Sequence, residues 1–178
     1  MSIPKPPDPA KLVISVFMRD KAFLGKVFDP LEQIGGRADM ISNWLAFDFT
    51  DYYHKEMGSP LYRKVIAFKD LIDQQDLARI KTLTNQVEEK NLVKGKRQVN
   101  IDPGYLLPSR FILATGKDYS HRIYIGERVY ADLTLIYTKQ GFRPLEWTYP
   151  DYSSSELTDF LEKIRNKYVL DLKERQNK

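Results

Sequence analysis

The segment LVISVFM, residues 12–18, decides the fold class of this chain of 178 residues. It is almost continuously apolar and rich in β-branched side chains, which is typical of a central strand that is buried on both faces. Further strands are predicted where apolar and polar residues alternate at 45–49, and at 62–68, 97–101 and 110–115. A sheet of this kind needs helices to cover its faces.

Two long helices are predicted, at residues 76–91 and 156–173. Apolar residues of the second follow one another at steps of three or four and form a single stripe, made of Leu157, Leu161, Ile164, Tyr168 and Leu172. A shorter helix is expected after Asp20, with a break at Asp29-Pro30.

Too few helices separate the predicted strands for a doubly wound parallel sheet. We therefore expect an α+β fold. It is a single domain with a mostly antiparallel or mixed sheet of about six or seven strands, covered by the two longer helices.

The clearest predicted hairpin joins residues 121–125 to residues 128–138 through a turn at Gly126-Glu127. A glycine in the first turn position is typical of a type II′ turn. In the second strand, strict alternation predicts that Val129, Leu133 and Leu135 all face the same side of the sheet.

The chain divides into a short arm and one domain. Four of the ten prolines fall within the first nine residues, which predicts an extended Pro-rich arm over 1–10 and a domain over 11–178. The sequence contains no cysteine, no secretory signal and no run of about 18 apolar residues, so we expect a cytoplasmic protein without a membrane partner.

The positive charge is concentrated at the C-terminus. The last sixteen residues carry six basic and two acidic side chains, which accounts for the net charge of +4. A basic amphipathic helix is typical of a solvated face, but it also suits nucleic acid. The basic residues are Lys163, Arg165, Lys167, Lys173, Arg175 and Lys178.

Four segments outside the predicted helices concentrate polar and aromatic residues, at 48–58, 100–105, 116–122 and 147–152. They contain six of the eleven tyrosines, namely Tyr52, Tyr53, Tyr105, Tyr119, Tyr149 and Tyr152. Turns alone do not require aromatic rings, which are costly to leave in water.

The strings FDFTDYYHKEMGSPL, VNIDPGYL, SHRIYI and WTYPDY, in this order, resemble a prokaryotic family known as domain of unknown function 4416. The resemblance extends from Lys11 to about Tyr168. It implies a stand-alone domain of about this length with no established activity. Some members of that family are labelled GTP-binding proteins, but this sequence lacks the G-x-x-x-x-G-K-[ST] phosphate loop.

Asp51, Asp102 and His121 are the candidate catalytic residues, because carboxylates and imidazoles move protons near neutral pH. Each also has a structural explanation. Asp51 follows a strand end, Asp102 lies in an Asp-Pro-Gly turn, and His121 begins a predicted strand.

Arg122 is the first candidate for binding a ligand, since its planar fork fits a carboxylate or a phosphate. The alternative is an internal partner, with Asp102 or Glu146 as the candidates. The other predicted ligand-binding residues are Tyr53, Asn100, Tyr105 and Tyr149.

No metal ligand is assigned, and the cofactor stays unknown. With no cysteine and only two histidines, a zinc site is disfavoured. Magnesium remains a candidate, because its sites need only one or two protein carboxylates plus water and a substrate phosphate. The candidate carboxylates are Asp48, Asp51, Glu56 and Asp102.

Three functional hypotheses follow. The first is that the protein binds or processes a small anionic ligand, phosphorylated or carboxylated, at a site built from the DFTDYY, NIDPGY and SHR segments. The second is a nucleic-acid-associated domain that uses the basic helix and stacking tyrosines. The third is a non-catalytic protein-interaction module with aromatic anchors.

Overall fold

The computed structural model describes residues 1–176, and its strands form one antiparallel sheet. The strands are β1 (Ala10–Met18), β2 (Ala38–Ile41), β3 (Leu45–Phe47), β4 (Leu61–Ile72), β5 (Val99–Leu107), β6 (Arg110–Thr115), β7 (Arg122–Gly126), β8 (Val129–Thr138) and β9 (Gly141–Pro144). The helices are α1 (Leu24–Gly35), α2 (His54–Met57), α3 (Leu77–Lys90) and α4 (Ser155–Gln176), with 3₁₀ turns η1 (Lys21–Phe23), η2 (Gln74–Asp76) and η3 (Pro150–Ser153).

The strand order is β2-β4-β1-β5-β6-β8-β7, with β3 paired to β4 and β9 paired to β8. Every residue of β1 is buried, which confirms the prediction of a central strand. The α+β class is also confirmed, but the sheet has nine strands rather than six or seven. The two strands that were not predicted, β2 and β9, have four residues each, too few for a clear alternating pattern.

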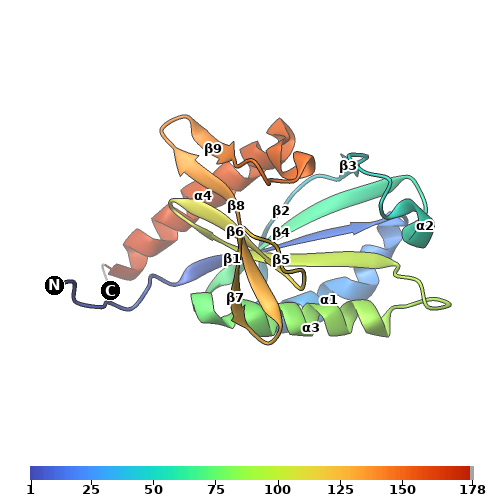
Figure 1. Cartoon of the computed structure of the whole chain (residues 1–178), viewed down its shortest axis with the longest axis horizontal. Helices are drawn as coiled ribbons and strands as arrows, with labels where there is room; N and C mark the ends of the chain where they lie inside the picture. The colour runs from blue at the N-terminus through green and yellow to red at the C-terminus, as the bar shows by residue number, and fades with distance from the viewer. Residues whose placement is uncertain (177–178) are drawn as a thin grey trace.

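Helices cover both faces of the sheet. The helices α1 and α3 lie against one face, and α4 lies against the other (Figure 1). Successive side chains of β1 point to opposite faces of the sheet, so Ile14 packs with α1 and α3 whereas Val13 packs with α4.

The prediction of two long helices is wrong, because α1 is a third, with 12 residues. The expected break at Asp29-Pro30 does not occur, and Pro30 lies inside the helix. The buried side chains of Val27 and Leu31 hold α1 against the sheet on either side of the proline. Tertiary packing thus overrides the local breaker signal.

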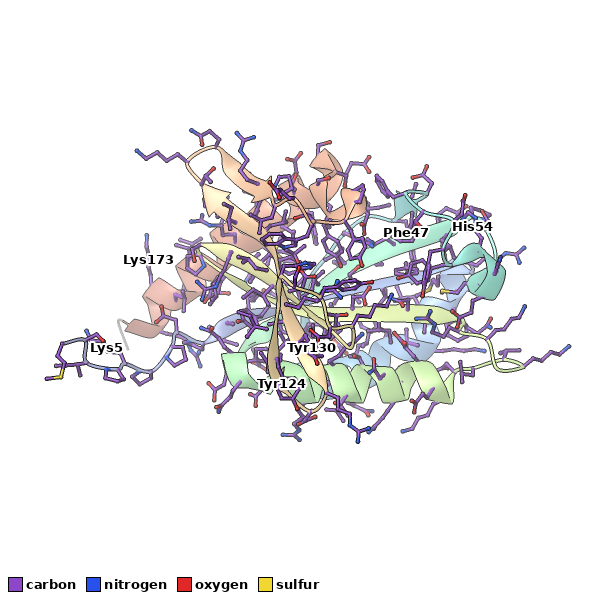
Figure 2. The ribbon with its side chains drawn as sticks, viewed as in Figure 1. Lys5, Phe47, His54, Tyr124, Tyr130 and Lys173 are labelled. Atoms are coloured by element: carbon purple, nitrogen blue, oxygen red, sulfur yellow. The ribbon has the colours of Figure 1, made fainter. Side chains whose placement is uncertain are left out.

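The β7–β8 hairpin is present, but its turn lies one residue later than predicted. The residues between the strands are Glu127 and Arg128, and both have positive φ (50° and 60°), which is the type I′ arrangement. At its outer surface Tyr124 and Tyr130 lie side by side, with ring centroids 5.5 Å apart (Figure 2).

A β-bulge at Thr134 breaks the strict alternation predicted for β8. Phe111 pairs with Leu135 but Ile112 pairs with Leu133, so one extra residue stands on β8. Leu133 therefore packs on the α3 side, whereas Leu135 packs on the α4 side.

Residues 1–9 contain no helix or strand. Beyond them, the fully buried Lys11 joins β1 to its neighbours, with its ammonium 2.7 Å from Asp39 and 3.3 Å from Asp171 of α4. No helix within residues 1–176 is long and apolar enough to cross a membrane.

Candidate functional site

The strands β5 and β6 are paired along only part of their length. Residues 104–107 of β5 pair with 110–113 of β6, and within residues 1–176 no strand pairs with 99–103 on that side. Side chains of α3 supply the missing backbone partners. Lys81 Nζ donates to the Ile101 carbonyl at 2.8 Å, and the Ile101 amide donates to Glu88.

A cavity of about 650 Å³ lies at this divergence. Its volume is in the range of about 300–1,000 Å³ that is typical of small-molecule sites. The aromatic residues in its wall are Phe17, Phe47, Phe49, Tyr52, Tyr53, Tyr119, Tyr149 and Tyr152, and the charged ones are Arg63, Lys81, Glu88, Arg97, Asp102, Lys117, Arg122, Asp132 and Asp151.

A chain of polar contacts fixes the part of the cavity next to β5. The Arg97 guanidinium binds both carboxylate oxygens of Glu56, at 2.8 and 2.7 Å, and donates to Asn100 Oδ1 at 2.7 Å. Asn100 Nδ2 in turn donates to Asp102 Oδ2 at 2.7 Å. The Lys81 ammonium is 3.6 Å from the other Asp102 oxygen. Asp102 is therefore held as an acceptor between an amide and a cation.

Two carboxyl groups of this region have opposite pKa shifts. The hydrogen bonds from Arg97 lower the pKa of Glu56. Burial raises the pKa of Glu88 to about 7, although the charges of Lys81 and Arg97 oppose the shift. Glu88 is thus a buried group in the cavity wall that exchanges a proton near neutral pH.

Arg122 has an internal partner, and that partner is neither Asp102 nor Glu146. Its Nε donates to Asp132 Oδ2 at 2.8 Å, and its Nη1 donates to the Lys117 carbonyl at 3.0 Å. Arg122 and Asp132 face each other across β7 and β8 in register, so the strand pairing itself brings them together.

The bulge in β8 positions the last aromatic segment. Trp147 Nε1 donates to the Leu133 carbonyl at 2.9 Å, and Thr148 Oγ1 donates to the Thr134 carbonyl at 2.6 Å. Trp147 and Thr148, which these two hydrogen bonds fix, lie just before Tyr149 and η3. They therefore hold Tyr149 and the η3 residues Asp151 and Tyr152 at the cavity.

Arg63 lies inside a box of aromatic rings. Its guanidinium carbon is 4.8 Å from the Phe47 centroid and 4.6 Å from the Tyr152 centroid, and its Nη2 pairs with Asp151. The Nε and Nη1 atoms of Arg63 are buried without a hydrogen-bond partner, as is the Tyr152 hydroxyl.

Five of the eight predicted site residues line the cavity, namely Asp102, Arg122, Tyr53, Asn100 and Tyr149. They come from four of the sequence segments, so the fold does bring these segments together. Asp102 is the one predicted catalytic residue in the cavity wall, and it lies within β5 rather than in the predicted Asp-Pro-Gly turn, because residues 102–104 pair with β1.

The other three predicted residues lie elsewhere. Asp51 is almost fully exposed and pairs with His54 at the start of α2. His121 lies behind Asp132, at 3.3 Å, and stacks on Trp147. Tyr105 points away from the side of β5 that carries Asn100 and Asp102, and it packs with Leu77 of α3.

Several cavity residues were missed by sequence reasoning, although two of them left a signal. Arg63 has the same strand parity as the buried Leu61 and Val65, which places a charge on an inward face. Lys81 and Glu88 are two helical turns apart on α3 and therefore share one side of that helix. Arg97 and Asp132 were missed as well, whereas Lys117, Asp151 and Tyr152 lie in segments that the sequence singled out but were not assigned to the site.

Two further features of the described residues bear on ligands. Within residues 1–176, no group of three His, Asp or Glu side chains is placed to hold a metal ion. A second hollow, of about 200 Å³ beside α4, is lined by residues such as Lys69 and Lys167 and by no aromatic ring.

Comparison with known proteins gives one match. Residues 8–168 match the family described as "Domain of unknown function (DUF4416)". No curated protein and no solved structure matches the chain.

Proposed function

Because the chain belongs to the DUF4416 family, whose description names no activity, we propose a function from the cavity: the protein binds a small organic anion there. The ligand class is a phosphorylated or carboxylated compound with a flat ring. The observation that carries this proposal is the combination, in one cavity of about 650 Å³, of stacking rings with cations that have free bonding capacity.

The rings near the solvent suit a flat group. Tyr52, Tyr119 and Tyr149 line the cavity and are each more than half exposed. Two of them already stack on cations, because Lys117 Nζ lies 4.9 Å from the Tyr52 centroid and the Arg122 guanidinium 4.6 Å from that of Tyr119. A planar ligand would bury these exposed faces at a low entropic cost.

The charges of the wall favour an anion. Asp102, Asp132 and Asp151 are each within 4 Å of a basic side chain. Lys117, by contrast, has no carboxylate within salt-bridge distance among residues 1–176, and it lies at the cavity. A ligand with a negative group would therefore meet an unpaired cation, whereas a cationic ligand would meet no unpaired carboxylate among these three.

The contacts of α4 give less support to the nucleic-acid alternative. Arg165 donates to the Pro108 carbonyl and stacks on Tyr137, and Lys167 pairs with Asp39 and Asp171. These two cations stabilise the fold rather than form a free basic face, and Lys178 lies outside the described residues.

A thermal-shift titration tests the proposal with phenyl phosphate and benzoate as probes. Phenol and inorganic phosphate serve as the ring-only and anion-only references. At ten times Kd, a bound probe should stabilise the protein by about 1.4 kcal/mol, which is an increase of about 3–6 °C in Tm.

A pair of lysine variants shows whether the probes occupy the cavity. Lys117→Gln should reduce the shift, whereas the matched change Lys139→Gln, at an exposed position in the β8–β9 turn, should not. Failure of both probes to shift the Tm of the wild type, or equal shifts for the two variants, would contradict the proposed function.

A further inference from the structure

The buried polar atoms that lack a partner are gathered in one place. Among residues 1–176, the buried side-chain nitrogen and oxygen atoms without a hydrogen-bond partner are Nε and Nη1 of Arg63, the Tyr152 hydroxyl and Ser15 Oγ. Buried polar groups nearly always have a hydrogen-bond partner, so a cluster of groups without one needs an explanation.

These residues are neighbours on the α4 face of the sheet. Ser15 of β1 pairs with Val65 of β4, two positions after Arg63, and Tyr152 of η3 stacks over the Arg63 guanidinium at 4.6 Å. Arg63 and Tyr152 also line the cavity, whereas Ser15 lies beneath them in the sheet. Arg63 and Tyr152 thus belong to the cavity wall, and their unpaired N–H and O–H groups are covered in the free protein.

The cost of this arrangement is high unless something binds there. Arg63 is buried, and it has one carboxylate partner, Asp151, on one of its three nitrogens. A buried donor left unpaired costs about 1–3 kcal/mol, and more when the group is charged. The rings of Phe47 and Tyr152 fix the guanidinium plane, so the two free nitrogens cannot swing out to water.

We propose that Arg63 and Tyr152 form an anion subsite in the wall of the cavity, where a carboxylate or phosphate oxygen of the ligand displaces the side chains that cover them and accepts hydrogen bonds from both. This inference rests on the proposed function, and it names the part of the cavity at which the charged group of the ligand binds. Burial raises the pKa of the Tyr152 hydroxyl, although the charge of Arg63 and the nearby Ser15 hydroxyl oppose the shift, so it stays protonated and can donate at physiological pH.

The subsite differs from the one that the sequence suggested. Arg122 also lines the cavity, but its Nε and Nη1 are already bound to Asp132 and to the Lys117 carbonyl. Arg63 has two free nitrogens, and their burial makes each bond to an anion stronger than at an exposed site. The flat part of the ligand then extends toward Tyr52, Tyr119 and Tyr149.

A matched pair of tyrosine variants tests the subsite. Tyr152 and Tyr168 are both buried, but the Tyr168 hydroxyl donates to the Pro9 carbonyl at 2.7 Å, whereas the Tyr152 hydroxyl has no partner. Tyr152→Phe should leave the Tm unchanged or higher, and should weaken benzoate and phenyl phosphate binding about tenfold. Tyr168→Phe should lower the Tm by about 2–4 °C and leave both affinities unchanged.

Arg63→Lys provides a second test, because it keeps a charge beside Asp151 but removes the planar fork. We expect it to weaken both probes by at least tenfold, with the fold checked by circular dichroism. If the variant does not fold, Tyr152→Phe decides alone. If the variant loses affinity for benzoate alone, the subsite binds carboxylates. If it loses affinity for phenyl phosphate alone, the subsite binds phosphates.

Other outcomes overturn the subsite. If Tyr152→Phe binds both probes as the wild type does while Lys117→Gln binds them more weakly, the subsite is wrong but the proposed function stands. A Tm loss in Tyr152→Phe equal to that in Tyr168→Phe would show that the hydroxyl already has a partner in the free protein. If neither probe binds the wild type, both proposals fail.

Discussion

Arg122→Lys is the most informative single change for the fold around the cavity. The substitution removes the Nε bond to Asp132, at 2.8 Å, and the Nη1 bond to the Lys117 carbonyl, at 3.0 Å. The side chains of Arg122 and Asp132 are only 3% and 8% exposed, so water does not replace these bonds.

The expected loss follows from these two bonds. Both bonds come from the charged guanidinium, and a buried hydrogen bond to a charged group contributes about 1.5–3 kcal/mol. Lysine keeps a positive charge near Asp132 and recovers part of the contribution of the first bond. The net decrease in the free energy of unfolding should therefore be about 2–3 kcal/mol, and Tm should fall by about 4–12 °C.

Urea denaturation followed by circular dichroism measures this decrease. Arg143→Lys is the matched control, because Arg143 lies exposed on β9 of the same sheet and should lose less than about 0.5 kcal/mol. If Arg122→Lys were as stable as Arg143→Lys, the buried pair would not hold β7 to β8. Arg122 would then be free to bind a ligand, as the sequence first suggested.

Three further changes have defined outcomes. Folding raises the pKa of Glu88 from about 4.5 to about 7, so the folded chain binds that proton more tightly and stability falls as the pH rises between these values. Glu88→Gln should remove about 3 kcal/mol of this pH-dependent decrease in the free energy of unfolding, as measured by urea denaturation at pH 5 and pH 7.5. Parallel pH profiles for the variant and the wild type would contradict this expectation. Lys11→Met should lower the free energy of unfolding by about 2 kcal/mol, because Asp39 and Asp171 lose a fully buried partner and keep Lys167, and a change below about 0.5 kcal/mol would refute that account. Gly104→Ala should cost about 2–3 kcal/mol in the same assay, since its Cβ would clash with the Ile112 carbonyl, whereas a neutral result would mean that β5 and β6 can move apart.

Sequence patterns predicted those parts of the fold that depend on local signals. Buried β1 and the apolar stripe of α4 are continuous in the chain, and both were found where expected. The helix break predicted at Asp29-Pro30 was wrong, because the buried residues that hold α1 together lie on other elements. The Thr134 bulge has no local sign at all, since it arises from the pairing of β8 with β6.

The candidate site was predictable to a similar degree. Aromatic and polar residues gathered in turns pointed to Tyr53, Asn100 and Tyr149, which all line the cavity. The role of Arg63 could not be predicted, because its partner Asp151 is far away in sequence and the divergence of β5 from β6 is a tertiary feature. The partner of Arg122 was missed for the same reason, since it depends on the register of β7 against β8.

The most direct test of the central claim is an NMR titration of the ¹⁵N-labelled protein with phenyl phosphate. If the cavity is the ligand site, the amide shifts should concentrate in the segments that line it, at residues 47–53, 100–102, 113–119 and 149–152. Amides of the α4 residues that line the smaller hollow, such as Lys167 and Asp171, should stay unchanged. Shifts confined to α4, or spread evenly over the surface, would contradict the claim that this cavity binds small organic anions.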